Sequence, residues 1–372
     1  MKEDINFNKP KKETRIVVAM SGGVDSSVVA CLLKEQGYDV IGITLQLFDY
    51  GEATKKSNTC CAGADIHDAK IVAQKFDFPH YVLNYENLFK DAVIDNFTNT
   101  YLQGETPIPC IECNKSVKFR DLFKVAKDLN ADALATGHYV KRGVSSSGEV
   151  EMHKALDHSK DQSYFLFSTT KDQLDFLRFP LGGNTKDFTR QEAKRLGLEI
   201  ADKPDSQDIC FVPNGDYGEV IRKYKPTAFK KGDLVHMTTG KTLGEHDGII
   251  NFTLGQRRGL GIAYEHPLYV VKIDPKKNIV YVGEEELLKN HQFTIRDLNW
   301  IATDVDTKNE ITAMVRLRSN SEEEAATVKI LPGNTAQITM HVPTRAITPG
   351  QACVIYNDSR VLGGGYITKD VI

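Results

Sequence analysis

Short runs of β-branched and apolar residues alternate with helical periodicity over the first two hundred residues. Residues 15–20 (RIVVAM) predict a buried strand, and the helix after them, from about Asp25, is expected to end at Gly37. Further strands are predicted at 40–47 (VIGITLQL), 80–84 (HYVLN) and 131–136 (ADALAT). Asp65 and Asn114 are expected to be the N-caps of two of the intervening helices. This alternation is typical of a parallel sheet covered by helices on both faces.

Beyond about Cys210 the pattern changes to short alternating runs separated by Gly, Asn and Asp turns, which predict a small β-rich unit. The last third contains ITAMVRLRS, ATVKILP, AQITMHV and QACVIYN at the regular spacing of an antiparallel barrel. We therefore expect an α/β fold in three domains. They are a parallel-sheet nucleotide-binding catalytic domain at 1–212, a central β-rich domain at 213–286 and a C-terminal antiparallel β-barrel at 287–372.

The composition of the 372 residues is that of a globular protein, with 47 Lys and Arg against 50 Asp and Glu and a net charge of -3. A nucleic-acid partner would therefore need a local basic face. No stretch reaches the roughly 18 apolar residues of a membrane span. The opening residues lack the apolar core of a signal peptide, so we expect a cytoplasmic protein with no membrane partner.

Seven cysteines are an odd number in a chain too long to need a disulfide framework, so some of them are expected to do chemistry. Cys31 lies within the first predicted helix and Cys353 within a C-terminal strand, and both are interpreted as core residues. Cys60 and Cys61 are adjacent in a polar segment. A zinc or auxiliary redox role is open for this pair, and an incidental position is the favoured interpretation.

Residues 20–27 (MSGGVDSS) connect the first predicted strand directly to a helix. Glycines let backbone amides converge on an anion, and a helix N-terminus adds partial positive charge, so this turn is suited to phosphate. No Lys follows the glycines, so it is not a Walker A loop. A purely structural turn is the alternative, and the strand–loop–helix context argues against it.

This loop resembles the SGGxDS signature of the PP-loop ATP pyrophosphatases at every position. The resemblance implies that ATP loses pyrophosphate after attack at its α phosphate, with Asp25, Ser26 and Ser27 holding phosphate oxygens and Mg²⁺. The ATP-binding residues expected in the loop are Ala19, Met20, Ser21, Gly22, Gly23, Val24, Asp25, Ser26 and Ser27. Leu45 and Gly137 are expected beside the adenine.

Two cysteines stand in segments suited to thiol chemistry. Cys113, in TPIPCIECNK, comes at or just before a predicted helix with Lys115 and Lys118 nearby, and these positive fields should lower its thiol pKa. Cys210 lies in KPDSQDICF near the end of the nucleotide domain. The two can meet if both loops lie at one edge of the sheet. Two reactive thiols beside an adenylating loop indicate sulfur transfer.

Several motifs in order along the chain resemble the tRNA-specific 2-thiouridylase family. They are SGGVDSS, TPIPCIECNKSVKF, ATGHY, KDQSYFL, DSQDICF and LGQRRGLG. The resemblance implies ATP-dependent adenylation of the carbon-2 oxygen of wobble uridine 34. Sulfur then comes from a persulfide on Cys210, with Cys113 as the nucleophile that releases it, giving 2-thiouridine, AMP and pyrophosphate.

One departure from the family pattern falls in the segment expected to contact the target base. Where the usual sequence is Asn-Pro-Asp, this chain has Ile108, Pro109 and Cys110. A thiol thus replaces an acid, which places any acid/base role there in doubt. Cys110, Cys113 and Cys210 together would suit a 4Fe-4S cluster with one open iron, as in related cluster-dependent tRNA thiolases. The persulfide route is favoured, and the cluster route stays open.

The same resemblance implies contacts with tRNA, for which solvated turns or strand faces are the alternative interpretation. The expected tRNA-binding residues are His138, Lys160, Asp161, Gln162, Arg316, Arg318 and Gln351, and Arg257 and Arg258 are further candidates. Implied partners are the wobble-uridine tRNAs for Lys, Glu and Gln, and a persulfide donor such as a cysteine desulfurase or a sulfur-relay protein. A PP-loop ligase of small substrates and a non-catalytic RNA-binding protein are the rival functions.

Overall fold

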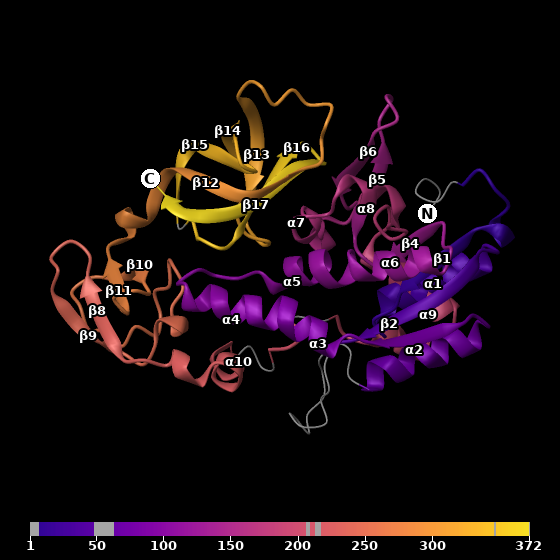
Figure 1. Cartoon of the computed structure of the whole chain (residues 1–372), viewed down its shortest axis with the longest axis horizontal. Coiled ribbons are helices and arrows are strands. Elements are labelled where there is room, and N and C mark those ends of the chain that lie inside the picture. Colours follow the sequence, from indigo (N-terminus) through magenta and orange to yellow (C-terminus); the bar gives the residue numbers. More distant parts are fainter. Residues whose placement is uncertain (1–6, 48–62, 206–208, 213–216, 346, 372) are drawn as a thin grey trace. The chain divides into compact units, whose positions relative to one another are not determined.

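The computed structural model describes residues 7–47, 63–205, 209–212, 217–345 and 347–371 (Figure 1). The chain divides into two compact units, which are described separately. Unit 1 comprises Met1–Ala92, Cys110–Pro213 and Ser359–Val361. Unit 2 comprises Val93–Pro109, Asn214–Asp358 and Leu362–Ile372.

Unit 1 contains a five-stranded parallel sheet with strand order β3-β2-β1-β4-β7. Its strands are β1 (Arg15–Ala19), β2 (Asp39–Gln46), β3 (His80–Asn84), β4 (Ala133–Thr136) and β7 (Leu177–Arg178). Its longer helices are α1 (Val24–Glu35), α2 (Gly63–Lys75), α6 (Asp121–Asp128) and α9 (Lys186–Arg195). Ile16 and Val18 of β1 share one core with Val28 of α1, Ala69 of α2 and Ala193 of α9. The predicted parallel α/β fold is confirmed.

Two expected helix caps are wrong. Asp65 lies in the first turn of α2 rather than before it. Asn114 lies inside a π-helix, η3 (Cys113–Lys118), which follows α5 (Pro109–Glu112), and its Nδ2 donates to the Phe165 carbonyl over 3.2 Å. The wider π turn makes the segment from Pro109 one nearly continuous helical stretch, so no N-cap is needed at Asn114.

Shorter elements complete unit 1. β5 (Val140–Val144) and β6 (Val150–Lys154) pair as an antiparallel hairpin. The other short elements described in unit 1 are α3 (Glu86–Phe89), the π-helix η2 (Lys90–Ile94), which continues into unit 2, α7 (Ser163–Leu166), α8 (Lys171–Phe176) and the 3₁₀ helices η1 (Lys11–Glu13), η4 (His158–Lys160) and η5 (Glu199–Asp202).

Unit 2 contains a small four-stranded sheet of order β10-β11-β8-β9. Its strands are β8 (Gly232–His236), β9 (Thr242–His246), β10 (Tyr269–Asp274) and β11 (Ile279–Gly283), with β8 and β11 parallel. Two helices, α4 (Asp95–Leu102) and α10 (Tyr217–Tyr224), pack together, with the rings of Phe97 and Tyr217 6.1 Å apart.

The C-terminal part of unit 2 is a closed six-stranded antiparallel barrel of order β12-β15-β14-β13-β16-β17, closed by pairing of β12 with β17. The strands are β12 (Lys289–Trp300), β13 (Ile311–Arg316), β14 (Glu324–Leu331), β15 (Thr335–Arg345), β16 (Ala352–Asn357) and β17 (Arg360–Val371). Ala313 and Val315 point into the barrel core, so Arg316 points outward by strand alternation. The predicted barrel is confirmed.

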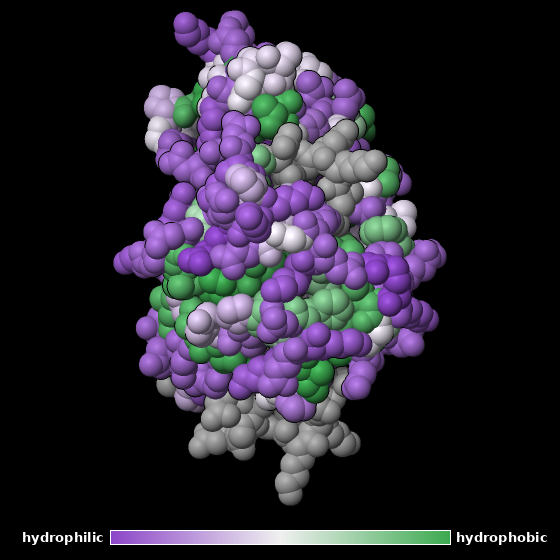
Figure 2. Space-filling model, turned by 90° about the vertical axis from the view of Figure 1, so that its right-hand side faces the viewer, coloured by the Kyte–Doolittle hydropathy of each residue, from purple (hydrophilic) through white to green (hydrophobic). Residues whose placement is uncertain are grey.

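Hydrophilic residues make up most of the face seen in Figure 2, and hydrophobic residues lie in bands between them. Within the described part of the chain, no helix combines the length and apolar character that crossing a bilayer requires.

Candidate functional site

The loop between β1 and α1 is held by its own serines. Ser26 Oγ accepts from the Ser21 amide over 3.1 Å and donates to the Gly23 carbonyl over 3.3 Å, which closes the turn over the start of α1. Ser27 is fully buried, and its Oγ has no hydrogen-bond partner among the described residues. A buried hydroxyl without a partner costs free energy unless a ligand satisfies it. The loop therefore has free polar capacity at a helix N-terminus, where anions bind.

Two glycines allow other segments to approach this loop closely. A Cβ on Gly137, just after β4, would lie 2.8 Å from the Ser26 amide nitrogen, and a Cβ on Gly22 would lie 2.1 Å from the Asp65 carbonyl oxygen. Gly22 also has a φ of 74°, which disfavours a side chain. Leu45 is buried near the end of β2, the strand whose Ile43 carbonyl accepts from the Met20 amide. The structure thus brings Gly137 against the start of α1 and β2 alongside Met20.

Asp25, in the first turn of α1, is the centre of a polar network. Its Oδ1 accepts from the Tyr139 hydroxyl over 2.9 Å, and its two oxygens accept from Lys186 Nζ over 2.7 and 2.8 Å. The Tyr139 hydroxyl lies 2.8 Å from Thr189 Oγ1 on α9. The Lys186 side chain is only 9% exposed, so its charge is paired within a nearly dry environment.

Asp205, five residues before Cys210, is bound by three cations. Its carboxylate lies 2.8 Å from Lys186 Nζ, 2.8 Å from Lys160 Nζ and 3.6 Å from the Arg190 guanidinium. Burial opposes ionisation of Asp205, but the hydrogen bonds from Lys160 and Lys186 outweigh it and lower the pKa of the carboxyl. Asp205 therefore stays charged and is itself held by Lys160, Lys186 and Arg190.

A second anchor on the same segment is Lys203. Its ammonium donates to the Gly22 carbonyl over 3.1 Å and to Asp65 and Asp68 on α2 over 2.5 and 2.7 Å. Burial disfavours the charge, but the hydrogen bonds to both carboxylates outweigh it and raise the pKa of the ammonium. Lys203 thus binds Gly22 in the phosphate loop, and Asp205 is linked through Lys186 to Asp25 at the start of α1.

The segments that carry the two candidate cysteines both lie beside α3. The ring of Phe211, next to the half-buried Cys210, packs edge-on against Phe89 of α3 with centroids 5.8 Å apart. The same helix contacts η3, which begins at Cys113. Both candidate cysteine segments therefore contact the same helix.

The expected low thiol pKa of Cys113 is wrong for this conformation. Cys113 is buried, and this burial raises the pKa of its thiol, while Lys118 lowers it and Glu112 raises it further. Desolvation outweighs the positive field that the sequence indicated. Cys110, by contrast, is exposed.

Two of the other cysteines lie in hydrophobic cores. Cys31 and Cys353 are fully buried, as predicted for core residues. Cys60 and Cys61 lie outside the described residues. Among the residues that are described, no three His, Cys, Asp or Glu side chains come together in a way suited to a metal ion.

The residues expected to contact tRNA in unit 1 are partly engaged in the fold. His138 Nδ1 lies 2.9 Å from Thr136 Oγ1, and burial, with Lys118, lowers the pKa of the imidazole to about 3, so the ring is neutral. Asp161 accepts from the Ala155 amide over 3.0 Å, and Gln162 Oε1 accepts from the Tyr139 amide over 2.8 Å. Gln162 therefore helps to position Tyr139, whose hydroxyl donates to Asp25, whereas Asp161 holds the backbone that follows β6.

The barrel residues expected to contact tRNA are half-buried and hydrogen-bonded within unit 2. Arg316 forms an ion pair of 2.7 Å with Glu323, and Arg318 donates to Thr348 Oγ1 over 3.0 Å. Gln351 donates to the Thr106 carbonyl over 3.2 Å, two residues before Ile108. Ile108 and Pro109 belong to unit 2, and Cys110 begins a part of unit 1.

Sequence reasoning did not find Lys186, Lys203 and Asp205 as site residues. Lys203 and Asp205 stand in the quoted KPDSQDICF motif, so their charges were a usable signal. Lys186 is 161 positions from Asp25 and belongs to no motif, so only the fold reveals it.

Comparisons with known proteins match nearly the full length of the chain. Family models match as the tRNA methyl transferase HUP domain (residues 14–214), the tRNA methyl transferase PRC-barrel domain (218–284) and the Aminomethyltransferase beta-barrel domain (290–367). The chain is 58% identical over 365 residues to the tRNA-specific 2-thiouridylase MnmA of Rickettsia conorii (strain ATCC VR-613 / Malish 7), covering 98% of each chain. It is 57% identical to that of Rickettsia africae (strain ESF-5), covering 98% of this chain and 100% of the other.

Solved structures are more distant. A 4-thiouridine synthetase in complex with RNA and ATP is 18% identical, with a TM-score of 0.34, and the match covers 53% of this chain and 45% of that one.

Proposed function

Because the chain belongs to the family of tRNA-specific 2-thiouridylases, we propose that it converts a wobble uridine of tRNA to 2-thiouridine at the expense of ATP. The observation that carries the proposal is the attachment of Lys203 and Asp205, seven and five positions before Cys210, to the phosphate loop and the start of α1. If the adenylating loop and the sulfur-carrying cysteine are held close together, adenylation and sulfur transfer can act in turn on one bound base. The products are 2-thiouridine, AMP and pyrophosphate.

ATP is assigned to the loop of residues 19–27, with its β and γ phosphates at the start of α1. The buried Ser27 hydroxyl without a partner and the close approaches at Gly22 and Gly137 support this assignment. Asp25 and Ser27 would hold Mg²⁺, which when bound neutralises phosphate charge. Lys186 and Lys203 lie at the same loop and would stabilise the charge that develops on pyrophosphate. Leu45 and Gly137 are assigned to the adenine.

The chemistry balances over three transfers. The carbon-2 oxygen of uridine attacks the α phosphorus of ATP, and pyrophosphate leaves. The terminal sulfur of a Cys210 persulfide then attacks carbon 2, and AMP leaves, so that base and Cys210 are joined through a disulfide. The Cys113 thiolate attacks the Cys210 sulfur, which frees the thiouridine and leaves a Cys113–Cys210 disulfide for a cellular dithiol to reduce. Because Cys113 is buried as a thiol here, it must lose its proton when tRNA docks.

The tRNA contacts are proposed on both units. Ile108, Pro109 and Cys110 are assigned to the target base. The remaining assigned residues are His138, Lys160, Asp161, Gln162, Arg316, Arg318 and Gln351. Since His138 is neutral, it would act as a hydrogen-bonding group and not as a cation. We assign residues 1–212 to catalysis, 213–286 to a central domain and 287–372 to tRNA binding.

We also propose the biological setting. The substrates are the wobble-uridine tRNAs for Lys, Glu and Gln, and a cysteine desulfurase or a sulfur-relay protein in the cytoplasm supplies the persulfide. A 4Fe-4S cluster on Cys110, Cys113 and Cys210 is the competing sulfur carrier, and the experiment below separates the two.

The test is anaerobic thiolation of unmodified tRNA with a persulfide donor, comparing the native chain with Cys110→Ala, Cys113→Ala and Cys210→Ala and measuring iron. We expect Cys113→Ala and Cys210→Ala to lose thiolation, with Cys210→Ala still releasing tRNA-dependent pyrophosphate, and the protein to be iron-free. Thiolation that survives Cys210→Ala would refute the persulfide assignment. Stoichiometric iron that is lost in Cys110→Ala together with activity would establish the cluster instead.

A further inference from the structure

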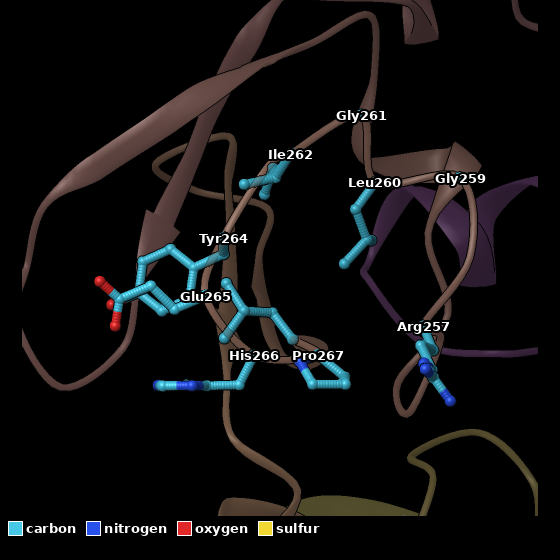
Figure 3. A pocket seen from close by; sticks show the side chains of 10 residues that line it. Arg257, Gly259, Leu260, Gly261, Ile262, Tyr264, Glu265, His266 and Pro267 are labelled. Atoms are coloured by element: carbon cyan, nitrogen blue, oxygen red, sulfur yellow. The ribbon is translucent and has the colours of Figure 1, made fainter.

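A pocket of about 460 Å³ lies in the central part of unit 2, formed by one loop between η8 (Ile249–Asn251) and β10. The pocket is lined by Arg257, Gly259, Leu260, Gly261, Ile262, Tyr264, Glu265, His266, Pro267 and Leu268. Figure 3 shows Arg257 at one end, Glu265 and His266 at the other, and Leu260 pointing into the space between them. The volume falls in the range of about 300–1,000 Å³ typical of small-molecule sites.

The loop is built around Gln256. Its Oε1 accepts from the Thr253 amide over 2.9 Å, and its Nε2 donates to the Arg258 carbonyl over 3.0 Å. The backbone of Gln256 accepts from the Val270 amide at the start of β10 over 2.9 Å. These bonds fix the backbone on both sides of Arg257, so the Arg257 side chain extends from an ordered main chain.

The far end of the pocket is aromatic. The Tyr264 ring is 41% exposed and lies 5.3 Å from the buried His236 ring at an interplanar angle of 34°. His266 meets Tyr264 edge-on at 5.7 Å. His236 is held in turn because its Nδ1 accepts from the Thr238 amide over 3.3 Å. An exposed ring supported from behind is a platform on which a planar base can stack.

Charge divides the pocket into two ends. Arg257 and Arg258 are exposed and form no ion pair within the described part of the chain. Glu265 lies at the opposite end, so an anionic group is attracted to the arginine end and repelled from the Tyr264 end. A carboxylate at the same end of the pocket as Tyr264 can accept hydrogen bonds from an exocyclic amino group.

We propose that this pocket binds one unpaired nucleotide of the tRNA other than the target uridine. Its base stacks on Tyr264 with an amino group toward Glu265, and its phosphate lies at Arg257. A nucleotide supplies both an anionic phosphate and a planar base, whereas a bare anion would leave the aromatic platform unused. The proposal rests on the proposed function, because it assumes a tRNA substrate.

The test measures binding of unmodified tRNA by fluorescence anisotropy and thiolation under single turnover. Tyr264→Ala should weaken binding about 5- to 100-fold, as for the loss of one base stack, and Tyr264→Phe should bind within about twofold of the native chain. Arg257→Gln should weaken binding and lower the slope of log affinity against log salt by about 1. Met237→Ala, an exposed apolar residue that does not line the pocket, is the matched control.

A crosslink locates the nucleotide. A benzophenone amino acid in place of Tyr264 should crosslink to a single tRNA position away from uridine 34, mapped by reverse-transcription stops. Native affinity in both Tyr264→Ala and Arg257→Gln, or a crosslink to uridine 34, would overturn the pocket assignment while leaving thiolation intact. Conversely, a native chain that binds tRNA through this pocket without thiolating it would overturn the proposed function and leave the pocket standing.

Discussion

Lys186 Nζ lies 2.8 Å from Asp205 Oδ1, and the same ammonium lies 2.7 Å from Oδ1 of Asp25. One nearly buried cation therefore joins Asp25, at the phosphate loop, to Asp205, which stands five positions before Cys210. Because a buried ion pair resists separation, movement at one end is transmitted to the other. Occupation of the loop by phosphates, which would compete with Asp25 for Lys186, is expected to change how firmly Asp205 is held.

This arrangement predicts that Asp205→Asn separates the two half-reactions. The substitution leaves the loop and Lys203 in place, so ATP affinity should stay within about threefold, while sulfur transfer to adenylated tRNA should slow about 10- to 100-fold because the Cys210 segment is misplaced. Rapid-quench measurements of pyrophosphate release and thiouridine formation check this. Asp202→Asn, at an exposed ion pair with Lys194, is the control. Equal losses in both steps would argue against the coupling.

Gly137→Ala tests the close approach behind the loop. The new Cβ would lie 2.8 Å from the Ser26 amide nitrogen, so the start of α1 must shift, at a cost of about 1–3 kcal/mol in stability, and the displaced loop should bind ATP more weakly. Calorimetric titration with a non-hydrolysable ATP analogue measures the change. Gly183→Ala, where a Cβ meets nothing within 4 Å, should bind as the native chain does. Native affinity in Gly137→Ala would mean that this contact does not shape the nucleotide site.

The state of Cys113 gives a pH prediction. Burial raises the pKa of its thiol, so alkylation by iodoacetamide without tRNA should be slow at pH 7 and increase only above the pH range of an ordinary thiol, while the exposed Cys110 reacts first. Since Lys118 lowers this pKa and Glu112 raises it, Lys118→Met should shift the profile to higher pH and Glu112→Gln to lower pH. Peptide mass spectrometry reads each cysteine separately. Equal rates for both cysteines at pH 7 would contradict the burial of Cys113.

The parts of the fold and site that local pattern determines were predictable, and the parts that depend on tertiary packing were not. The strand, glycine turn and helix at residues 15–35 follow from spacing alone, because each element signals its own boundary. The thiol pKa of Cys113 was predicted with the wrong sign, since the sequence displays nearby lysines but not the packing that desolvates the sulfur. Lys186 reaches Asp25 from a distant helix, and no local rule marks it.

On the barrel, the ion pair between Arg316 and Glu323 should weaken the binding of tRNA phosphate by Arg316. A phosphate that binds Arg316 must compete with Glu323, so Glu323→Gln should tighten tRNA binding by about two- to fivefold at low salt. Arg318→Gln should instead weaken binding and lower the salt slope by about 1. Glu310→Gln, at an exposed pair with Lys329, removes the same charge elsewhere on the barrel and is the control. Equal tightening in both glutamate variants would show that only net charge matters.

His138 should make the stability of the nucleotide domain depend on pH. Its folded pKa of about 3 lies below the ordinary value of 6.5, so the unfolded chain takes up a proton on acidification that the folded chain refuses. The contribution of His138 to the free energy of unfolding is therefore fully present above about pH 6.5. It decreases as the pH falls, by about 2 kcal/mol between pH 7 and pH 5. In His138→Gln this loss should disappear, whereas His158→Gln, at an exposed histidine, should retain it. Hydrogen-exchange protection of the β4 amides at pH 7 and pH 5 measures this decrease in stability for unit 1. If His138→Gln lost as much stability between the two pH values as the native chain, the His138 ring would be protonated in the folded chain.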